Sequence, residues 1–266
     1  MTRSILSAAS VLWLAAVVTP DVQGQSDEVG DTESRWQAAA IYTHQNLRDQ
    51  SDWRSVSLLG GWASTMHTVV VEMQVLEREA VREAAFGADL YQDLPGGGYA
   101  TGRGRFAAEG DVLPRLLAGA DVYRPVWGPW EGWVGYEYRA YPGSNVHTFG
   151  AGPGVYVDRW YLRVRPSVSR AGGETTVVGK FLARRIIDDS STDYIELGAG
   201  AGSEFVEIVR EGAGAIEIEA RDTWLISARA QRFVTRNLGV TAGGVYQTYD
   251  VLGARPTLTV GVLGRW

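Results

Sequence analysis

The sequence has 266 residues, a formal net charge of −6 and no cysteine. The absence of cysteine excludes a disulfide framework and thiolate chemistry, and the acidic balance is the opposite of a nucleic-acid-binding footprint. Glycine (33), tyrosine (12) and tryptophan (10) are abundant while lysine is nearly absent, a composition that suits closely packed β-strands with aromatic ends.

The first 24 residues have the pattern of a secretory signal peptide. Arg3 precedes an apolar run at residues 5–18, Pro20 ends the run, and small residues precede a cleavage position before Gln25. An uncleaved membrane helix is the alternative, but a span needs about 20 apolar residues. We therefore predict a signal peptide at 1–24, an acidic periplasmic lead-in at 25–34 and a β-barrel at 35–266.

From residue 35 onward the chain alternates between apolar and polar residues with the period of a β-strand. Helical periodicity is absent over the same region. The pattern predicts about fourteen strands, or twelve if two pairs merge, at residues 35–44, 53–63, 67–77, 81–92, 98–108, 113–123, 131–141, 146–156, 159–169, 174–186, 192–202, 221–232, 236–248 and 256–266.

The alternation fits either a soluble β-sandwich or a membrane barrel. In residues 159–169, for example, Leu162 and Val164 share a face opposite Arg163 and Arg165. The strands are near the ~9–11 residues of a membrane strand, and longer connections alternate with shorter ones. We therefore predict an all-β, antiparallel transmembrane β-barrel in the bacterial outer membrane, with a secreted sandwich as the alternative.

Residues 203–220 alternate around a glycine-rich centre and resemble a hairpin. We expect this segment to extend its two flanking strands above the membrane. The alternative is an additional pair of strands.

Aromatic residues gather at the predicted strand ends, as the interfacial girdles of a barrel require. The set comprises Trp36, Trp53, Trp62, Tyr91, Tyr99, Trp127, Trp130, Tyr141, Tyr156, Trp160 and Trp266. Among these, Trp36, Trp160 and Trp266 are the predicted membrane-interface anchors. The lipid bilayer of the outer membrane is accordingly the main predicted partner.

Charged residues on the polar faces are the candidate functional residues. An Arg or Lys facing lipid costs roughly 2–4 kcal/mol at the bilayer midplane, so these residues are assigned to the lumen. They are Glu72, Glu83, Asp89, Arg103, Arg105, Asp121, Glu137, Arg139, Arg163, Arg165, Lys180, Arg184, Glu196 and Arg229. Opposite charges either cross-link and plug a narrow lumen or form a transverse field that guides a polar or anionic solute.

Catalytic signals are weak. His44 and His147 are expected near the outer rim, with Ser144 and His147 in a loop, and this pair motivates a lipid-modifying enzyme as the alternative function. The acidic residues near 188–193 are expected to form a solvated turn. No catalytic residue, cofactor or metal site is predicted, since cysteine ligands and a His-Glu-x-x-His motif are absent.

Several segments resemble the YaiO family of outer-membrane β-barrels. The similar segments are residues 135–141, 156–166, 182–194 and 197–202, with 52–55 and 261–266 similar to the family's two ends. The sequence departs from the family at Trp266, where phenylalanine is more frequent. The resemblance implies a barrel inserted by the barrel-assembly machinery, with Trp266 ending the insertion signal. It implies no agreed activity and no catalytic residues, and a link to surface polysaccharide passage is family analogy alone.

Overall fold

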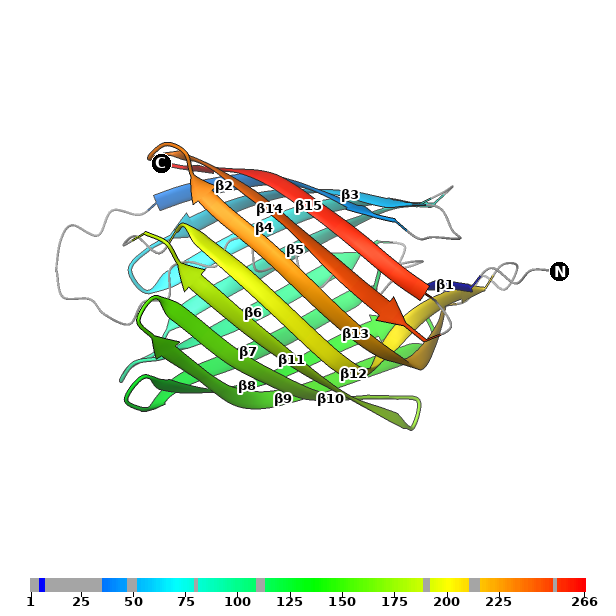
Figure 1. Ribbon diagram of the computed structural model, residues 1–266. Coiled ribbons are helices and arrows are strands. Elements are labelled where there is room, and N and C mark those ends of the chain that lie inside the picture. Colours follow the sequence, from blue (N-terminus) through cyan, green and yellow to red (C-terminus); the bar gives the residue numbers. More distant parts are fainter. Residues whose placement is uncertain are drawn as a thin grey trace.

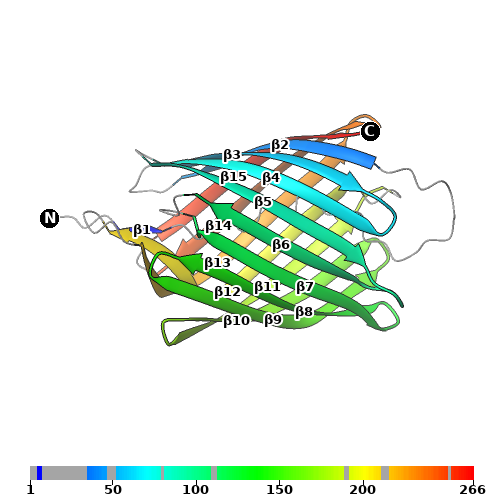
Figure 2. The same ribbon diagram turned by 180° about the vertical axis from the view of Figure 1, so that it is seen from behind.

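The computed structural model describes residues 5–7, 35–46, 52–78, 81–108, 113–188, 192–210, 216–250 and 253–266. Strands β2 to β15 form a closed antiparallel barrel in which each strand pairs with its neighbours in sequence (Figures 1 and 2). The strands are β2 (Arg35–Gln45), β3 (Trp53–Ala63), β4 (His67–Arg78), β5 (Val81–Asp93), β6 (Tyr99–Ala107), β7 (Leu116–Trp127), β8 (Trp130–Tyr141), β9 (Ser144–Val157), β10 (Trp160–Ala171), β11 (Glu174–Ile186), β12 (Tyr194–Arg210), β13 (Ile216–Phe233), β14 (Leu238–Tyr249) and β15 (Gly253–Arg265).

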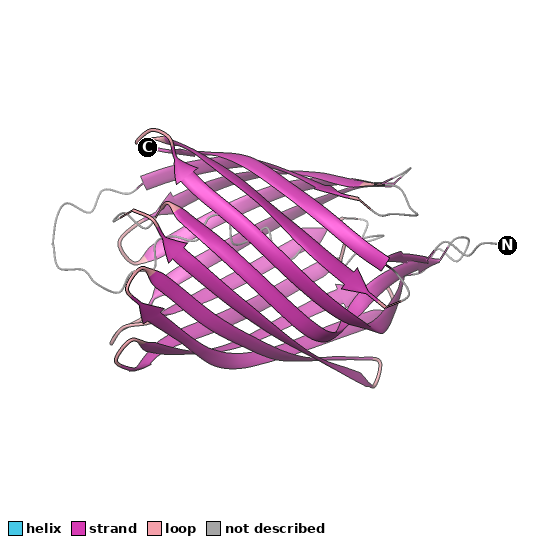
Figure 3. Ribbon diagram, viewed as in Figure 1, coloured by secondary structure: helices cyan, strands magenta, loops and turns pink. Residues whose placement is uncertain are grey.

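The described residues contain strands and short connections throughout (Figure 3). Within this part of the chain, no helix is long and apolar enough to cross a membrane. A short strand, β1 (Ile5–Ser7), pairs with the far end of β12. It falls inside the segment expected to be a signal peptide, and cleavage of that segment stays a prediction.

The barrel closes between its first and last strands. β15 pairs with β2 from Thr257 opposite Gln45 to Arg265 opposite Gln37. Beyond that ladder, the Trp36 N–H donates to the Trp266 carbonyl at 2.9 Å, and the Trp266 N–H donates to the Trp36 carbonyl at 3.0 Å. Among the described strands, β2 to β15 each pair on both sides, so closure avoids the unpaired edges that a hydrocarbon environment would not tolerate.

The fourteen-strand prediction is confirmed, and the alternative of twelve is wrong. Apart from β12 and β13, which the hairpin at 203–220 lengthens, the largest shift is in β7, which was expected at 113–123 and runs from Leu116 to Trp127. The hairpin prediction for 203–220 also holds, because β12 and β13 stay in one register from Tyr194 opposite Gln231 to Val209 opposite Ile216.

The two ends of the barrel differ mainly in this long hairpin. We call the end that holds Trp36 and Trp266 the terminus end, and the opposite end the loop end (Figure 1). Connection lengths do not separate the ends as expected. The β8–β9 and β10–β11 turns at the loop end are as short as the β7–β8 and β9–β10 turns at the terminus end.

Alternation produces an apolar outer wall and a polar lumen. The outward side chains exposed along the wall include Val71, Phe86, Phe149, Val168, Val177, Ile226 and Val262. The inward side chains buried inside the barrel include Ser57, Glu72, Gln74, Asp121, Glu196, Thr241 and Gln247.

Only part of the expected aromatic girdle lies on the outside. Trp36, Trp127, Trp130, Trp160 and Trp266 are exposed at the terminus end. The expectation was wrong for five residues that point inward. Trp53, Tyr99 and Tyr141 are buried, and Tyr91 and Tyr156 pack on the inward rings of Tyr99 and Tyr161. Position at the end of a strand sets the height of a ring in the membrane, but the alternation of the strand sets its face.

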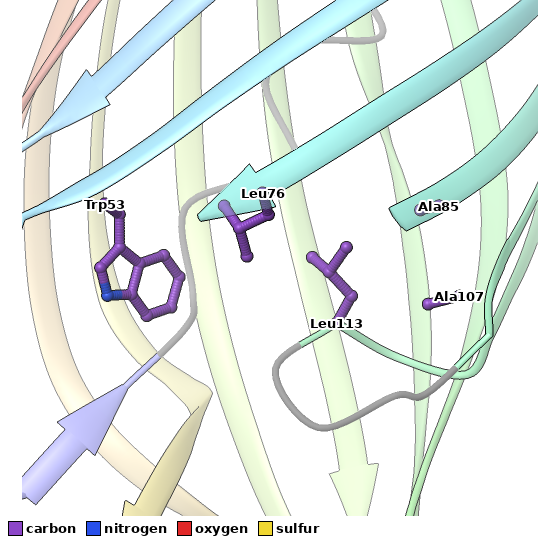
Figure 4. Close-up of a cluster of buried hydrophobic side chains, with 5 residues drawn as sticks. All are labelled: Trp53, Leu76, Ala85, Ala107 and Leu113. Carbon is purple, nitrogen blue, oxygen red and sulfur yellow. The ribbon is translucent and has the colours of Figure 1, made fainter. Parts of the chain in front are cut away.

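Two apolar clusters narrow the lumen at the loop end. In the first, Leu113 from the segment before β7 turns inward and packs with Trp53, Leu76, Ala85 and Ala107 (Figure 4). The backbone N–H of Leu113 donates to a Glu83 carboxylate oxygen at 2.8 Å, which anchors the segment inside the barrel. This inward fold explains why β7 starts later than expected.

The second cluster comes from the β12–β13 hairpin. Phe205 on β12 packs with Tyr141, Val146 and Ala171, the inward residues that end β8, begin β9 and end β10. Pairing of β12 with β11 stops at Gly202 opposite Val178, and Gly202 has φ of 142°. The hairpin therefore leaves the wall at Gly202 and leans across the mouth.

We predict that deleting Trp266 lowers the amount of folded barrel in the outer membrane. The deletion removes two backbone hydrogen bonds at the closing seam together with an interfacial ring. Heat-modifiable migration in membrane fractions measures the folded amount. Trp127→Ala, which removes another exposed ring far from the seam, is the control, and equal losses in both variants would contradict a seam-specific role.

A second prediction concerns the hinge. In Gly202→Ala the new Cβ would meet the Val177 carbonyl oxygen, and the backbone angle disfavours any Cβ. We expect the variant to lose about 1–3 kcal/mol of folding free energy. Gly104→Ala, whose Cβ would meet nothing within 4 Å, should keep wild-type resistance to urea unfolding. Equal urea midpoints for the two variants would remove the hinge assignment.

Candidate functional site in the barrel lumen

Strand alternation puts every predicted lumen charge on the inner face. The acids and bases then separate into those that are paired across strands and those that are not. The paired residues belong to two groups on opposite halves of the strand order, and two arginines stand outside both groups.

The first group runs across β4 to β10. Nη2 of Arg105 on β6 lies 2.8 Å from Oε2 of Glu72 on β4. Its neighbour Arg103 reaches Asp121 on β7 at 2.6 Å, and Arg165 on β10 reaches the same carboxylate at 3.0 Å. Asp121 is therefore clamped between two guanidinium groups, and its residue is only 3% exposed.

Glu137 on β8 extends this group. Arg103 lies 3.7 Å from Glu137, and Arg139 on the same strand lies 3.4 Å from it. Arg165 pairs with Asp121 instead of Glu137. Asp89 on β5 also points inward, and its register partner is Arg103.

The second group lies on β11 to β14. Arg184 holds Glu196 through two contacts, from Nε at 2.9 Å and from Nη2 at 2.7 Å. Lys180 lies 3.8 Å from Glu204. Glu204 also accepts hydrogen bonds from Gln247 at 2.6 Å and from the Tyr249 hydroxyl at 2.8 Å. The carboxylate at the base of the hairpin thus ties β12 to β11 and β14.

Arg163 and Arg229 stand apart from both groups. Among the described residues, neither has a carboxylate within ion-pair distance. Arg163 donates from Nη1 to the Tyr123 hydroxyl at 3.0 Å, and Arg229 donates from Nε to Thr241 at 3.4 Å. The Nε of Arg163 and the Nη2 of Arg229 are buried without a hydrogen-bond partner.

An aromatic cluster lines the inner wall toward the terminus end. Tyr91, Tyr99 and Tyr123 stack in sequence, with ring centroids 5.1 Å and 4.3 Å apart, and Trp133 follows at 6.4 Å. Arg165 lies over the Trp133 ring at 4.5 Å. Arginines and flat rings share this wall, an arrangement stabilised by cation–π attraction.

Sequence reasoning missed four inward charged residues. Glu131 is buried and accepts a hydrogen bond from the Tyr161 hydroxyl at 2.8 Å. Arg78 and Arg255 are buried over the rings of Trp53 and Tyr249, and Glu204 was counted as part of the hairpin. Glu131, Arg78 and Arg255 lie near strand ends, where the alternation could have identified their faces once the strand bounds were known.

The histidines do not converge. Nε2 of His44 lies 3.5 Å from Oδ2 of Asp52, and Nδ1 of His67 contacts the Gln92 side chain. His147 was expected in a loop but belongs to β9, on its outer face, where Nδ1 shares a hydrogen bond with the Tyr136 hydroxyl at 2.9 Å. The bonding partner of His147 is thus a tyrosine and not Ser144.

The acidic turn near 188–193 is held by its own backbone. Asp188 accepts hydrogen bonds from the Asp193 N–H at 2.9 Å and from the Thr192 hydroxyl at 3.2 Å; Asp189 lies outside the described residues. Over the part of the chain that is described, no group of three acidic or histidine side chains is arranged to hold a metal ion.

We predict that Asp121→Asn destabilises the barrel more than Lys180→Gln does. The first change leaves Arg103 and Arg165 facing each other without a buried counter-charge. We expect this to lower the free energy of unfolding by about 3 kcal/mol. The second removes a longer and more exposed contact. Urea unfolding in detergent, followed by tryptophan fluorescence, compares the two variants, and an equal midpoint would contradict the assignment of Asp121 as the centre of its group.

The fold has known relatives at low sequence identity. A bacterial polysaccharide outer membrane secretin is 10% identical with a TM-score of 0.50, covering 88% of this chain and 99% of that chain. An outer membrane channel from Pseudomonas putida F1 is 10% identical with a TM-score of 0.48, covering 92% and 99%. An anion-selective porin from Comamonas acidovorans is 7% identical with a TM-score of 0.44, covering 89% and 100%. At this identity the likeness to the secretin concerns the fold alone.

Among curated proteins, no match to this chain is found. The model of the YaiO membrane beta barrel domain matches residues 36–205, which is more than half of the chain and spans β2 through most of β12. The closed barrel, its apolar outer wall and this match agree, and the chain belongs to the YaiO family of membrane β-barrels in the bacterial outer membrane.

Proposed function

We propose that this barrel is a narrow passive channel whose lumen favours small anionic or polar solutes. The observation that carries the proposal is the state of Arg163 and Arg229. Both point into the lumen without a carboxylate partner among the described residues, and each keeps a buried guanidinium nitrogen without a hydrogen bond. A buried cationic donor of this kind is costly unless an anion or water can reach it.

The paired charges support the same proposal. Asp121, Glu137 and Glu196 already have arginine partners, so their negative charge is largely compensated. Arg163 and Arg229 then contribute positive charge inside a low-dielectric wall. Rings of basic side chains select anions in pores by this means.

The loop-end clusters favour small solutes over polymer chains. Leu113 and Phe205 bring apolar side chains into the mouth from two different sides. A polysaccharide would need both to move, so we restrict the proposal to small solutes. No residue is assigned a catalytic role.

The test is planar-bilayer recording with purified protein in asymmetric KCl. We expect discrete conductance steps and a reversal potential that indicates anion preference. Arg163→Gln and Arg229→Gln should shift the reversal potential toward cations, and the double variant should shift it further.

Arg232→Gln is the matched control, because Arg232 lies on the outer face of the strand that carries Arg229. It should leave the reversal potential unchanged. Phe205→Ala should raise the step size by widening the mouth. Recordings without steps from both the native protein and Phe205→Ala would overturn the channel proposal, as would cation preference in the native protein.

A further inference from the structure

A polar patch lies on the outer wall at the loop end, on the side of β8, β9 and β10. We call it the rim patch, and its outward residues are Tyr136, Tyr138, Asn145, His147 and Arg170. Tyr138 is the register partner of His147, which in turn is the register partner of Arg170. Three neighbouring strands therefore bring two basic side chains and two tyrosines together.

The height of the rim patch coincides with the lipid headgroups. Along the outer face of β10, Trp160 at the terminus end is followed by Leu162, Val164, Pro166 and Val168, and then by Arg170. At a rise of about 3.3 Å per residue and a tilt of about 40°, the ten residue steps from Trp160 to Arg170 span about 25 Å along the membrane normal, the height of the apolar band of a barrel. Arg170 is thus the first outward charge beyond the hydrocarbon.

The hydrogen bonds of the rim patch leave donors facing outward. The Tyr138 hydroxyl donates to Oδ1 of Asn145 at 3.0 Å, which leaves the amide nitrogen of Asn145 as a donor. When the Tyr136 hydroxyl donates to Nδ1 of His147, Nε2 carries the ring proton. In the described part of the chain, no carboxylate lies within ion-pair distance of Arg170.

These donors border a hollow of about 500 Å³. Its lining includes Ser144, Asn145, His147 and Arg170, together with the glycines of the β8–β9 and β10–β11 turns. None of the described residues that line it is acidic. Small turn residues leave room, and the donors and positive charge suit an anion with several oxygen acceptors.

We propose that the rim patch binds the phosphate of a phosphorylated glycolipid in the outer leaflet. Arg170 pairs with the phosphate, His147 and Asn145 donate to its remaining oxygens, and the acyl chains lie against Phe149 and Val168 below. The lipid is favoured over a free phosphate ion because the hollow adjoins an exposed apolar wall, where the chains add burial energy. The inference does not depend on whether the lumen conducts.

The experiment is native mass spectrometry of the detergent-purified barrel titrated with bisphosphorylated lipid A. We expect one lipid to bind the native protein. Arg170→Gln should weaken binding at least about tenfold, the loss expected for one charge-assisted hydrogen bond, and His147→Gln should weaken it in the same direction. Heat-modifiable migration confirms that each variant is folded.

Arg82→Gln is the matched control. Arg82 is also exposed at the loop end, but its register partner is Glu77 and it lies on β5, away from the rim patch. It should bind like the native protein. Equal binding by Arg170→Gln or of dephosphorylated lipid A would overturn the proposal. Competition by inorganic phosphate at equal concentration would also overturn it, because the site would then be one for a free anion.

Discussion

The structure depends on one constraint, the absence of water from the hydrocarbon layer. Every backbone N–H and C=O group within that layer needs a partner inside the protein. A closed antiparallel barrel meets this need, and the seam from β15 to β2 completes it with the mutual hydrogen bonds of Trp36 and Trp266. The closed wall has an outer face toward lipid and an inner face toward the lumen, and the placement of the apolar and charged side chains follows from these two faces.

Closure assigns opposite chemistry to alternate residues. Outward side chains contact lipid and are apolar along the middle of the strands. Tryptophans and charged residues occupy the outward positions near the strand ends. The charged side chains, which would be costly in lipid, point inward, and many of them form ion pairs between strands. Asp121 between Arg103 and Arg165 shows the result, since a single buried acid joins β6, β7 and β10.

The loop end departs from the regular barrel. At Gly202 the chain leaves the wall with a backbone angle suited to glycine, and the β12–β13 hairpin leans onto Tyr141, Val146 and Ala171. On the other side Leu113 enters the mouth and is held by Glu83. Both features constrict a lumen whose wall alone would be wider, and they act through contacts between residues far apart in the sequence.

By itself the sequence predicted the barrel, about fourteen strands and the inward face of the charges in the middle of the strands, because alternation with period two and the cost of charge in lipid are local properties. It could not decide which charges meet. Glu137 and Asp121 are equally inward from β8 and β7, yet only the register and curvature of the closed sheet bring Arg165 to Asp121. Trp53, Tyr99 and Tyr141 proved to be inward rings because alternation, and not position at a strand end, sets the face of a side chain. Arg163 and Arg229 proved to have no ion pair within the described residues, since pairing depends on distances that arise only when the barrel closes.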